Sequence, residues 1–99
     1  MSMDLDPVIH APVRLRIVTH LDTSLVDPDD EVTFPRLQRD LELTAGNLTT
    51  HLAKLEQAGY VATSKTFSGR KPVTYVRLTH EGRAAFHTYR SALLKLLGE

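Results

Sequence analysis

The spacing of apolar residues changes at Gly59, and this change constrains the fold more than any other feature of the chain. Before it, Leu48, Leu52 and Leu55 recur at the three- and four-residue intervals of a helix that buries one face. After it, residues 60–67 and 73–78 are rich in Val, Thr and aromatic residues, which is typical of strands. The short segment SGRKP between them contains a glycine, so we predict a hairpin over 60–78.

Helical spacing dominates the rest of the chain, with a candidate N-cap residue at the start of four of the five predicted helices. Pro12 should separate the first two helices, because it cannot donate to a preceding turn. In the second, Val13, Ile17 and Leu21 should face the core. The predicted helices lie near 6–10, 12–21, 34–41, 45–58 and 80–97, and the candidate caps are Asp6, Thr33, Thr44 and Thr79.

A two-stranded hairpin is only marginally stable in water, so the hairpin needs helices or a third strand beside it. Residues 31–33 are the only obvious source of that strand. We therefore expect a single α+β domain over 1–99 that is mainly α, with a β-hairpin flanked by helices.

The amino-acid composition and the absence of known motifs argue against several classes of function. The chain has no cysteine, which excludes disulfides and thiolate metal sites. It has no glycine-rich phosphate loop and no convincing Ser/His/Asp set, so we predict neither an enzyme nor a cofactor. Its five histidines are expected to be solvated or partly buried, because a zinc site needs about four closely spaced ligands. No metal site is therefore predicted.

Nothing in the sequence points to a membrane. No apolar run approaches the roughly 20 residues that span a bilayer. The start, MSMDLDPVI, lacks the basic and apolar regions of a signal peptide. We expect a cytoplasmic, nucleoid-associated protein.

The formal net charge of zero conceals an uneven distribution. Residues 1–42 carry four arginines and nine acidic residues, a net charge of −5. Residues 43–99 carry eight lysines and arginines and three glutamates, a net charge of +5. Such a division indicates a basic working face, although chance scatter is an alternative.

Two short helices, 34–41 and 45–58, joined by a three-residue turn and followed by a basic hairpin indicate a helix-turn-helix with a wing. Opposite the leucines of 45–58 lie only small or polar side chains, which let a helix approach base edges in the major groove. Over 63–77 there are four cations and no acid, which suits the DNA backbone. The alternatives are an ordinary solvated helix face and a turn whose lysines protect a sheet edge.

We predict a set of DNA-contacting residues on these elements. His51 lies at the edge of the leucine stripe and is expected to pack or to touch a phosphate. Arg36 and Arg39 either touch the DNA backbone or pair locally with Asp40 or Glu42. The full set is Thr44, Gly46, Asn47, Thr49, Thr50, His51, Lys54, Arg36, Arg39, Lys65, Arg70 and Lys71.

The terminal helix carries more apolar surface than a small domain can easily cover, and a second subunit is the simplest cover. The predicted dimer interface consists of Val8, Ile9, Phe86, Tyr89, Leu93, Leu94, Leu96 and Leu97.

Two runs, LTTHLAKLEQAGYV and SGRKPVTYVRLTHEGRAAF, resemble winged-helix transcriptional regulators of the MarR and ArsR type, above all their small single-domain branch. The resemblance covers roughly residues 5–95. It implies a homodimeric prokaryotic regulator with helix 45–58 in the major groove and wing 67–72 beside it. A two-fold dimer would place two recognition helices about 34 Å apart on an inverted repeat.

The expected function is sequence-selective binding of double-stranded DNA as a transcriptional repressor. The alternatives are a winged helix that contacts proteins and an architectural DNA binder with little sequence preference.

Overall fold

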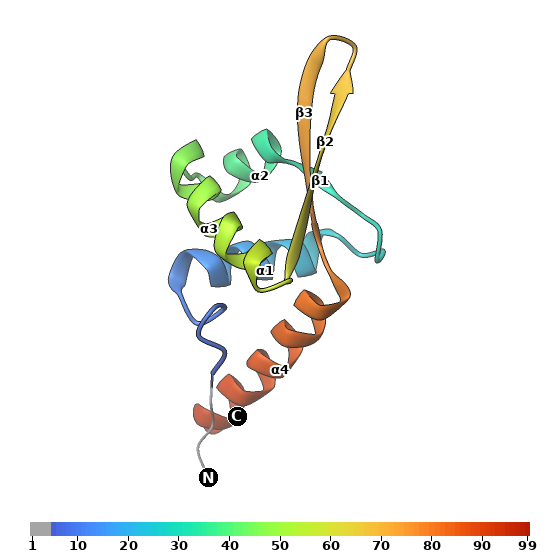
Figure 1. Cartoon of the computed structure of the whole chain (residues 1–99). Coiled ribbons are helices and arrows are strands. Elements are labelled where there is room, and N and C mark those ends of the chain that lie inside the picture. The colour runs from blue at the N-terminus through green and yellow to red at the C-terminus, as the bar shows by residue number, and fades with distance from the viewer. Residues whose placement is uncertain (1–4) are drawn as a thin grey trace.

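The computed structural model describes residues 5–99 as four helices and a small antiparallel sheet. Figure 1 shows the β2–β3 hairpin rising from one side of the helical body and α4 leaving at the opposite end, so the molecule is elongated, 54 × 26 × 22 Å. In chain order the elements are α1 (Pro12–Ser24), β1 (Val32–Thr33), α2 (Phe34–Leu41), α3 (Ala45–Gln57), β2 (Val61–Ser68), β3 (Lys71–Leu78) and α4 (His80–Leu96).

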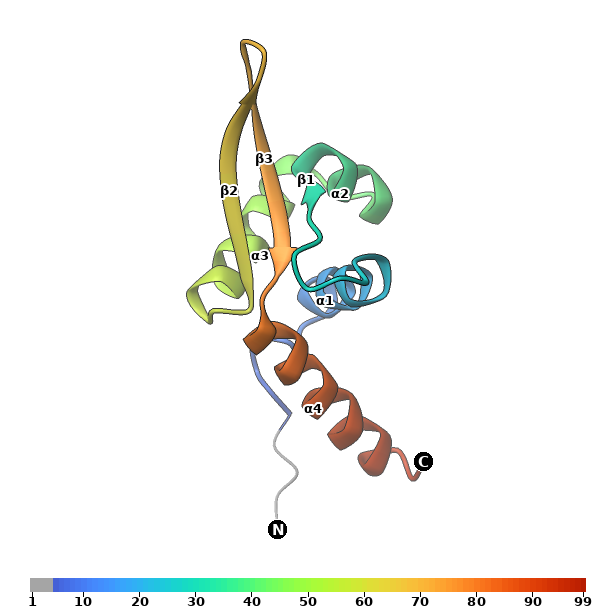
Figure 2. The same ribbon diagram turned by 90° about the vertical axis from the view of Figure 1, so that its right-hand side faces the viewer.

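The hairpin gains the third strand that its stability requires. The strand order is β1-β3-β2, and β1 pairs with the base of β3 through Val32 opposite Val76 and Thr33 opposite Tyr75. Figure 2 shows β1 beside β3 just before the chain enters α2. The sheet therefore fixes the base of the hairpin, while its outer half has no third strand.

Three threonines begin three of the helices, as predicted. The hydroxyl oxygens of Thr33, Thr44 and Thr79 accept hydrogen bonds from the backbone N–H three residues later, at 3.3, 3.1 and 2.9 Å. Each bond satisfies one of the N–H groups that a helix start leaves without a partner. Between α2 and α3 the chain turns at Glu42, which has a left-handed backbone with φ 54°.

The helix predicted near 6–10 is wrong, because this segment forms only a hydrogen-bonded turn. The Asp6 carboxylate accepts from the N–H groups of Val8 and Ile9 at 2.9 and 3.4 Å, and the His10 N–H donates to the Asp6 carbonyl at 2.7 Å. Aspartate thus caps a local turn. Helix α1 begins at Pro12 as expected, but it continues to Ser24 rather than ending near 21.

The core lies where α1, α2, α3, the base of the sheet and the first half of α4 meet. Ile17 and Leu21 are buried as predicted, whereas Val13 is only partly covered and Val18 takes a core position instead. The other buried apolar residues are Ile9, Leu25, Leu37, Leu41, Leu48, Leu52, Leu55, Val61, Val76, Leu78, Phe86 and Tyr89.

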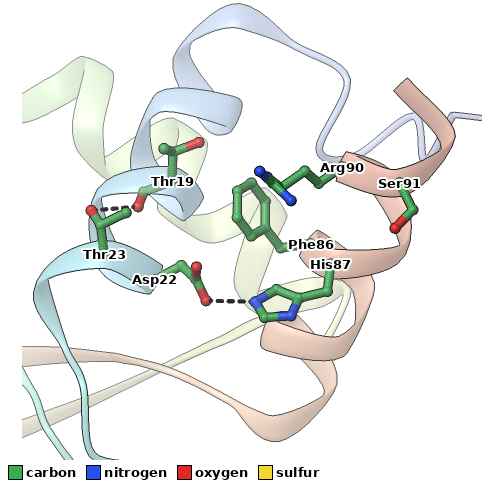
Figure 3. Close-up of a pocket in the computed structure, with 7 residues that line it drawn as sticks. All are labelled: Thr19, Asp22, Thr23, Phe86, His87, Arg90 and Ser91. Atoms are coloured by element: carbon green, nitrogen blue, oxygen red, sulfur yellow. Dashed lines mark hydrogen bonds and ion pairs between the residues drawn. The ribbon is translucent and has the colours of Figure 1, made fainter. Parts of the chain in front are cut away.

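Polar contacts fasten α4 to the end of α1. The Arg83 guanidinium donates to the Asp22 carboxylate at 2.7 Å and to the Leu25 carbonyl at 2.8 Å. His87 Nε2 lies 3.1 Å from the same Asp22 oxygen, and Figure 3 shows this contact at the edge of a hollow of about 380 Å³ between the two helices. The carboxylate is thus shared by two α4 side chains, which sets the position of α4 on the body.

Candidate nucleic-acid interface

Helix α3 has one apolar face and one face that is free of bulk. Leu48, Leu52 and Leu55 are buried against the body. The exposed residues on the rest of the helix are Ala45, Gly46, Asn47, Thr49, Thr50, Ala53, Lys54, Glu56 and Gln57. Its one acid, Glu56, accepts hydrogen bonds from the backbone and the hydroxyl of Thr63 on β2 at 3.3 and 2.8 Å. The acid is therefore directed toward the hairpin.

The first turn of α3 is open to a large partner. Thr44, Gly46 and Asn47 are exposed, and nothing lies within 4 Å of the position that a Cβ on Gly46 would occupy. The N-terminal residues of a recognition helix are those that contact base edges, and the positive end of the helix dipole favours phosphate. This turn therefore has both the access and the polarity that DNA requires.

His51 is half-buried, and α1 holds it in place. Its Nδ1 lies 3.2 Å from Arg14 Nη1, while Arg14 Nε donates to the Val8 carbonyl at 2.6 Å. A guanidinium can only donate, so this His51 nitrogen is the acceptor. The predicted packing role of His51 therefore has a defined partner.

Arg14 is a basic residue beside α3 that sequence reasoning missed. It lines a shallow hollow of about 330 Å³ together with Lys54 and Gln57 of α3 and Pro7, Val8 and Ala58. No local sequence signal marks it, because it reaches α3 only through the packing of α1 against that helix. The hollow brings two cations to one side of α3.

Arg36 adopts the local pairing that was one of its two predicted roles. Its Nε lies 3.2 Å from Asp40 Oδ1, one helical turn away, and His20 Nε2 lies 3.2 Å from Asp40 Oδ2. Although desolvation opposes them, the hydrogen bonds from Arg36 and His20 lower the pKa of Asp40. Arg36 and Arg39 are both exposed, so neither is removed from reach of a DNA backbone.

The hairpin covers nearly the predicted range, but its strands extend farther toward the tip and its turn is tighter than predicted. Strand β2 continues to Ser68 and β3 begins at Lys71, so the loop is only Gly69 and Arg70 rather than SGRKP. Gly69 has φ 67°, and a glycine with positive φ at the first central position is typical of a two-residue type II′ hairpin turn. Lys65, Arg70 and Lys71 are exposed along this wing.

A groove of about 350 Å³ separates α3 from the wing. It is lined by Phe34, Thr49, Leu52, Ala53, Glu56, Thr63, Lys65 and Thr74. Thr63 and Thr74 were not among the predicted contacts. Alternation along β2 places Thr63 with Lys65, but Thr74 joins them only through the register that sets it opposite Lys65. The groove thus lies between the exposed surface of α3 and the basic wing, and residues of both line it.

The predicted dimer residues fall into two groups. Ile9, Phe86 and Tyr89 are 0, 7 and 3% exposed within the chain itself, so their assignment to an intersubunit surface is wrong. The cause is the body of the same chain, which covers the first half of α4. Val8, Leu93 and Leu94 are half-buried, whereas Leu96 and Leu97 are 57 and 66% exposed.

Within residues 5–99 no three His, Asp or Glu side chains gather closely enough to hold a metal ion. None of the helices there combines the length and the apolar character that crossing a bilayer demands.

Comparison with known proteins bears on this arrangement. The family model described as "Winged helix DNA-binding domain" matches residues 13–97. The uncharacterized protein MJ0432 of Methanocaldococcus jannaschii is 41% identical over 63 residues, which are 64% of this chain and 68% of that protein.

Solved structures share the fold. A transcriptional regulator homologue from Pyrococcus horikoshii superposes with a TM-score of 0.81 at 33% identity, covering 92% of this chain and 85% of its own. HlyU from Vibrio cholerae gives 0.59 at 26% identity over 93% and 86%. ZitR, a zinc-responsive MarR family member from Lactococcus lactis, gives 0.63 at 17% identity over 94% and 60%, which shows the fold alone.

These matches confirm the predicted fold class, α+β and mainly α with a hairpin wing, and the resemblance to winged-helix DNA-binding domains. Helices α2 and α3 are the helix-turn-helix, and β2 and β3 are the wing. The chain belongs to the winged helix DNA-binding domain family.

Proposed function

We propose that this protein binds double-stranded DNA sequence-selectively as a homodimer and represses transcription at an inverted repeat. One observation carries the proposal: the exposed face of α3 bears mainly small and polar side chains, with Lys54 and Glu56 its only charged ones, beside a wing with four cations and no acid over residues 63–77. Cations near phosphates release condensed counterions, and a slim polar helix fits the major groove.

Base readout is assigned to the start and middle of α3. Asn47 offers an amide, which can bond to the edge of adenine through two hydrogen bonds. Thr49 and Thr50 are exposed, and each offers a hydroxyl as well as a methyl group that can contact thymine. Thr44 and Gly46 keep the first turn narrow enough for the backbone N–H groups to approach a phosphate.

Backbone contacts are assigned to the surrounding cations. Arg14 and Lys54 line one hollow beside α3, and Lys65 lines the groove on its other side. Arg70 and Lys71 extend the contact to the wing tip, while Arg39 serves the backbone near α2. Phosphate contacts of this kind set orientation and affinity, and they leave sequence preference to α3.

The homodimer is assigned to the end of α4. Leu96 and Leu97 are exposed, and Leu93 and Leu94 are only half-covered, on a helix that leaves the body opposite the wing (Figure 1). A two-fold pairing there would carry two α3 helices to successive turns of the same DNA face. A dimer seated on an operator excludes other proteins from that duplex, which is the basis for proposing repression.

The main rival function is a winged helix that contacts proteins. It requires an apolar or acidic α3 face and a wing without clustered cations, and both requirements disagree with the exposed residues found here. A non-selective DNA binder is the second rival, and equal affinity for unrelated sequences would identify it.

The deciding experiment is a fluorescence-anisotropy titration against a pool of random duplexes at several salt concentrations, followed by sequencing of the bound DNA. The proposal predicts enrichment of an inverted repeat and an affinity that falls steeply with salt. Binding without enrichment would identify an architectural binder. Absence of binding at low salt would remove the DNA function.

A further inference from the structure

Phe67 is an exposed aromatic residue near the wing tip that neither the core nor the assigned DNA contacts use. The residue is 72% exposed. Within residues 5–99 the other large exposed apolar side chains are Val26 in the loop after α1 and Leu96 and Leu97 at the end of α4. Phe67 is therefore separate from the proposed dimer surface and stands among cations.

The strand register shows which way Phe67 faces. Every second residue of a strand lies on the same face, so one face of β2 carries Val61, Thr63, Lys65 and Phe67. Val61 is buried in the core. Thr63 and Lys65 line the groove against α3. Phe67 is the next residue on that face, so it extends the groove side of the wing beyond the helical body.

Pro72 completes the apolar tip. It is paired directly with Phe67 across the hairpin, and residues paired in this way share a face of the sheet. The tight Gly69–Arg70 turn holds the pair at the end of a two-stranded arm that stands clear of the body in both views (Figures 1 and 2). Arg70 and Lys71 lie immediately beside them.

We infer that Phe67, supported by Pro72, is an apolar wedge that enters the minor groove of the bound duplex and partly unstacks a base step. This inference rests on the proposed DNA function and adds a specific contact to it. Proteins that enter the minor groove often insert Phe or Pro between base steps and bend the duplex. The charge around the wedge suits a DNA duplex, because every charged residue in 63–77 is a cation and DNA is a polyanion.

Minor-groove entry also gives the wing a role in selectivity. Unstacking costs least at flexible pyrimidine–purine steps such as TA and CA. We therefore expect operators to carry such a step where each wing tip lies, although no side chain reads its base edges.

The first test compares wing variants on the same duplex. Phe67→Ala should weaken binding about tenfold, a change of about 1.4 kcal/mol, without altering the salt slope. Phe67→Leu should retain most of the affinity because it keeps an apolar wedge. Val26→Ala, which removes another exposed apolar side chain in the loop after α1, should bind as wild type. All three substitutions are at exposed positions, so their thermal unfolding should match wild type.

The second test uses the absence of tryptophan from the chain. Phe67→Trp introduces a single reporter at the wedge, and its emission should be quenched and shielded from acrylamide when duplex DNA is added. Equal affinity of wild type and Phe67→Ala for duplex DNA, with Trp emission unchanged, would overturn the wedge and leave the proposed function intact. Shielding that grows with protein concentration before any DNA is added would assign Phe67 to a second copy instead. A wild-type protein that binds no duplex would remove the proposed function and the wedge together.

Discussion

Gly82, in the first turn of α4, lies directly against the backbone of Tyr60 at the start of the wing. A Cβ at position 82 would lie 2.0 Å from the Tyr60 carbonyl oxygen and 2.8 Å from its carbon. The same oxygen accepts the Thr79 N–H at 3.0 Å. The close approach of α4 to the end of α3 and the base of the wing is therefore possible only with glycine at position 82.

Replacing Gly82 with alanine should destabilise the protein, although alanine is the better helix former. The added methyl must displace a backbone carbonyl or the whole start of α4, and overpacking of this kind costs about 1–3 kcal/mol. Urea unfolding followed by circular dichroism measures the change.

Gly46→Ala is the matched control, because Gly46 lies in the first turn of α3 and nothing is within 4 Å of its added Cβ. Helix propensity should make that variant up to about 1 kcal/mol more stable. Equal effects of the two substitutions would show that packing against Tyr60 does not constrain position 82.

The residues of this junction explain how much the sequence alone could predict. The A-G-Y-V and L-T-x-x-G-R runs stand at the two ends of the hairpin, and Gly59, Tyr60, Thr79 and Gly82 meet at one place, where the Thr79 hydroxyl donates to the Gly59 carbonyl at 2.6 Å. Helix and strand periodicity and threonine caps predicted the elements on both sides of this junction, because those signals are local. The contacts themselves depend on three-dimensional packing.

The same distinction accounts for the residues that sequence reasoning misplaced or missed. Phe86 and Tyr89 have the spacing of an interface stripe, but only the packing of α4 shows that the body of the same chain covers them. Arg14 and Thr74 join the candidate interface through packing and strand register, respectively. Asp6 looks like a helix cap and instead closes a turn, because Pro12 sets the helix start farther on.

Stability should fall at high pH through Tyr60. Its hydroxyl donates to the Asp6 carboxylate, and this hydrogen bond, with burial and the carboxylate charge, raises the pKa of Tyr60 to about 12. An unfolded tyrosine titrates near 10. The protonated form is favoured in the folded protein, so the contribution is complete below pH 10 and is lost as the pH rises from 10 to 12.

Tyr60→Phe removes this hydrogen bond and should cost about 1 kcal/mol at neutral pH. Urea unfolding at pH 8, 10 and 11.5 checks both statements. The variant should lose less stability than wild type between pH 10 and 11.5. The variant should still lose some stability over this pH range, because burial also raises the pKa of Tyr89. Parallel pH profiles for the two proteins would contradict the role of Tyr60.

Residues of α3 should determine the sequence preference, whereas the cations of the wing should determine the overall affinity. Arg70→Ala combined with Lys71→Ala should weaken binding to every duplex and reduce the salt slope by about 2, since each phosphate contact contributes about 0.9. Asn47→Ala should leave the slope unchanged and cost about 1–3 kcal/mol only on the preferred sequence. Anisotropy titrations on a selected and a scrambled duplex compare the two. A uniform loss from both variants would mean that Asn47 does not read a base.

The end of α4 should control assembly. Leu97 is 66% exposed beyond the part of α4 that the body covers, so Leu97→Lys should disrupt a dimer without unfolding the subunit. Sedimentation velocity over a range of concentrations should show wild type as a dimer and this variant shifted toward monomer. Val26→Lys adds the same charge at another exposed apolar residue and should stay dimeric. Because a dimer places two recognition helices on one operator, Leu97→Lys should also lose its preference for an inverted repeat over a single half-site. A wild-type protein that sediments as a monomer at concentrations that saturate DNA would contradict the homodimer.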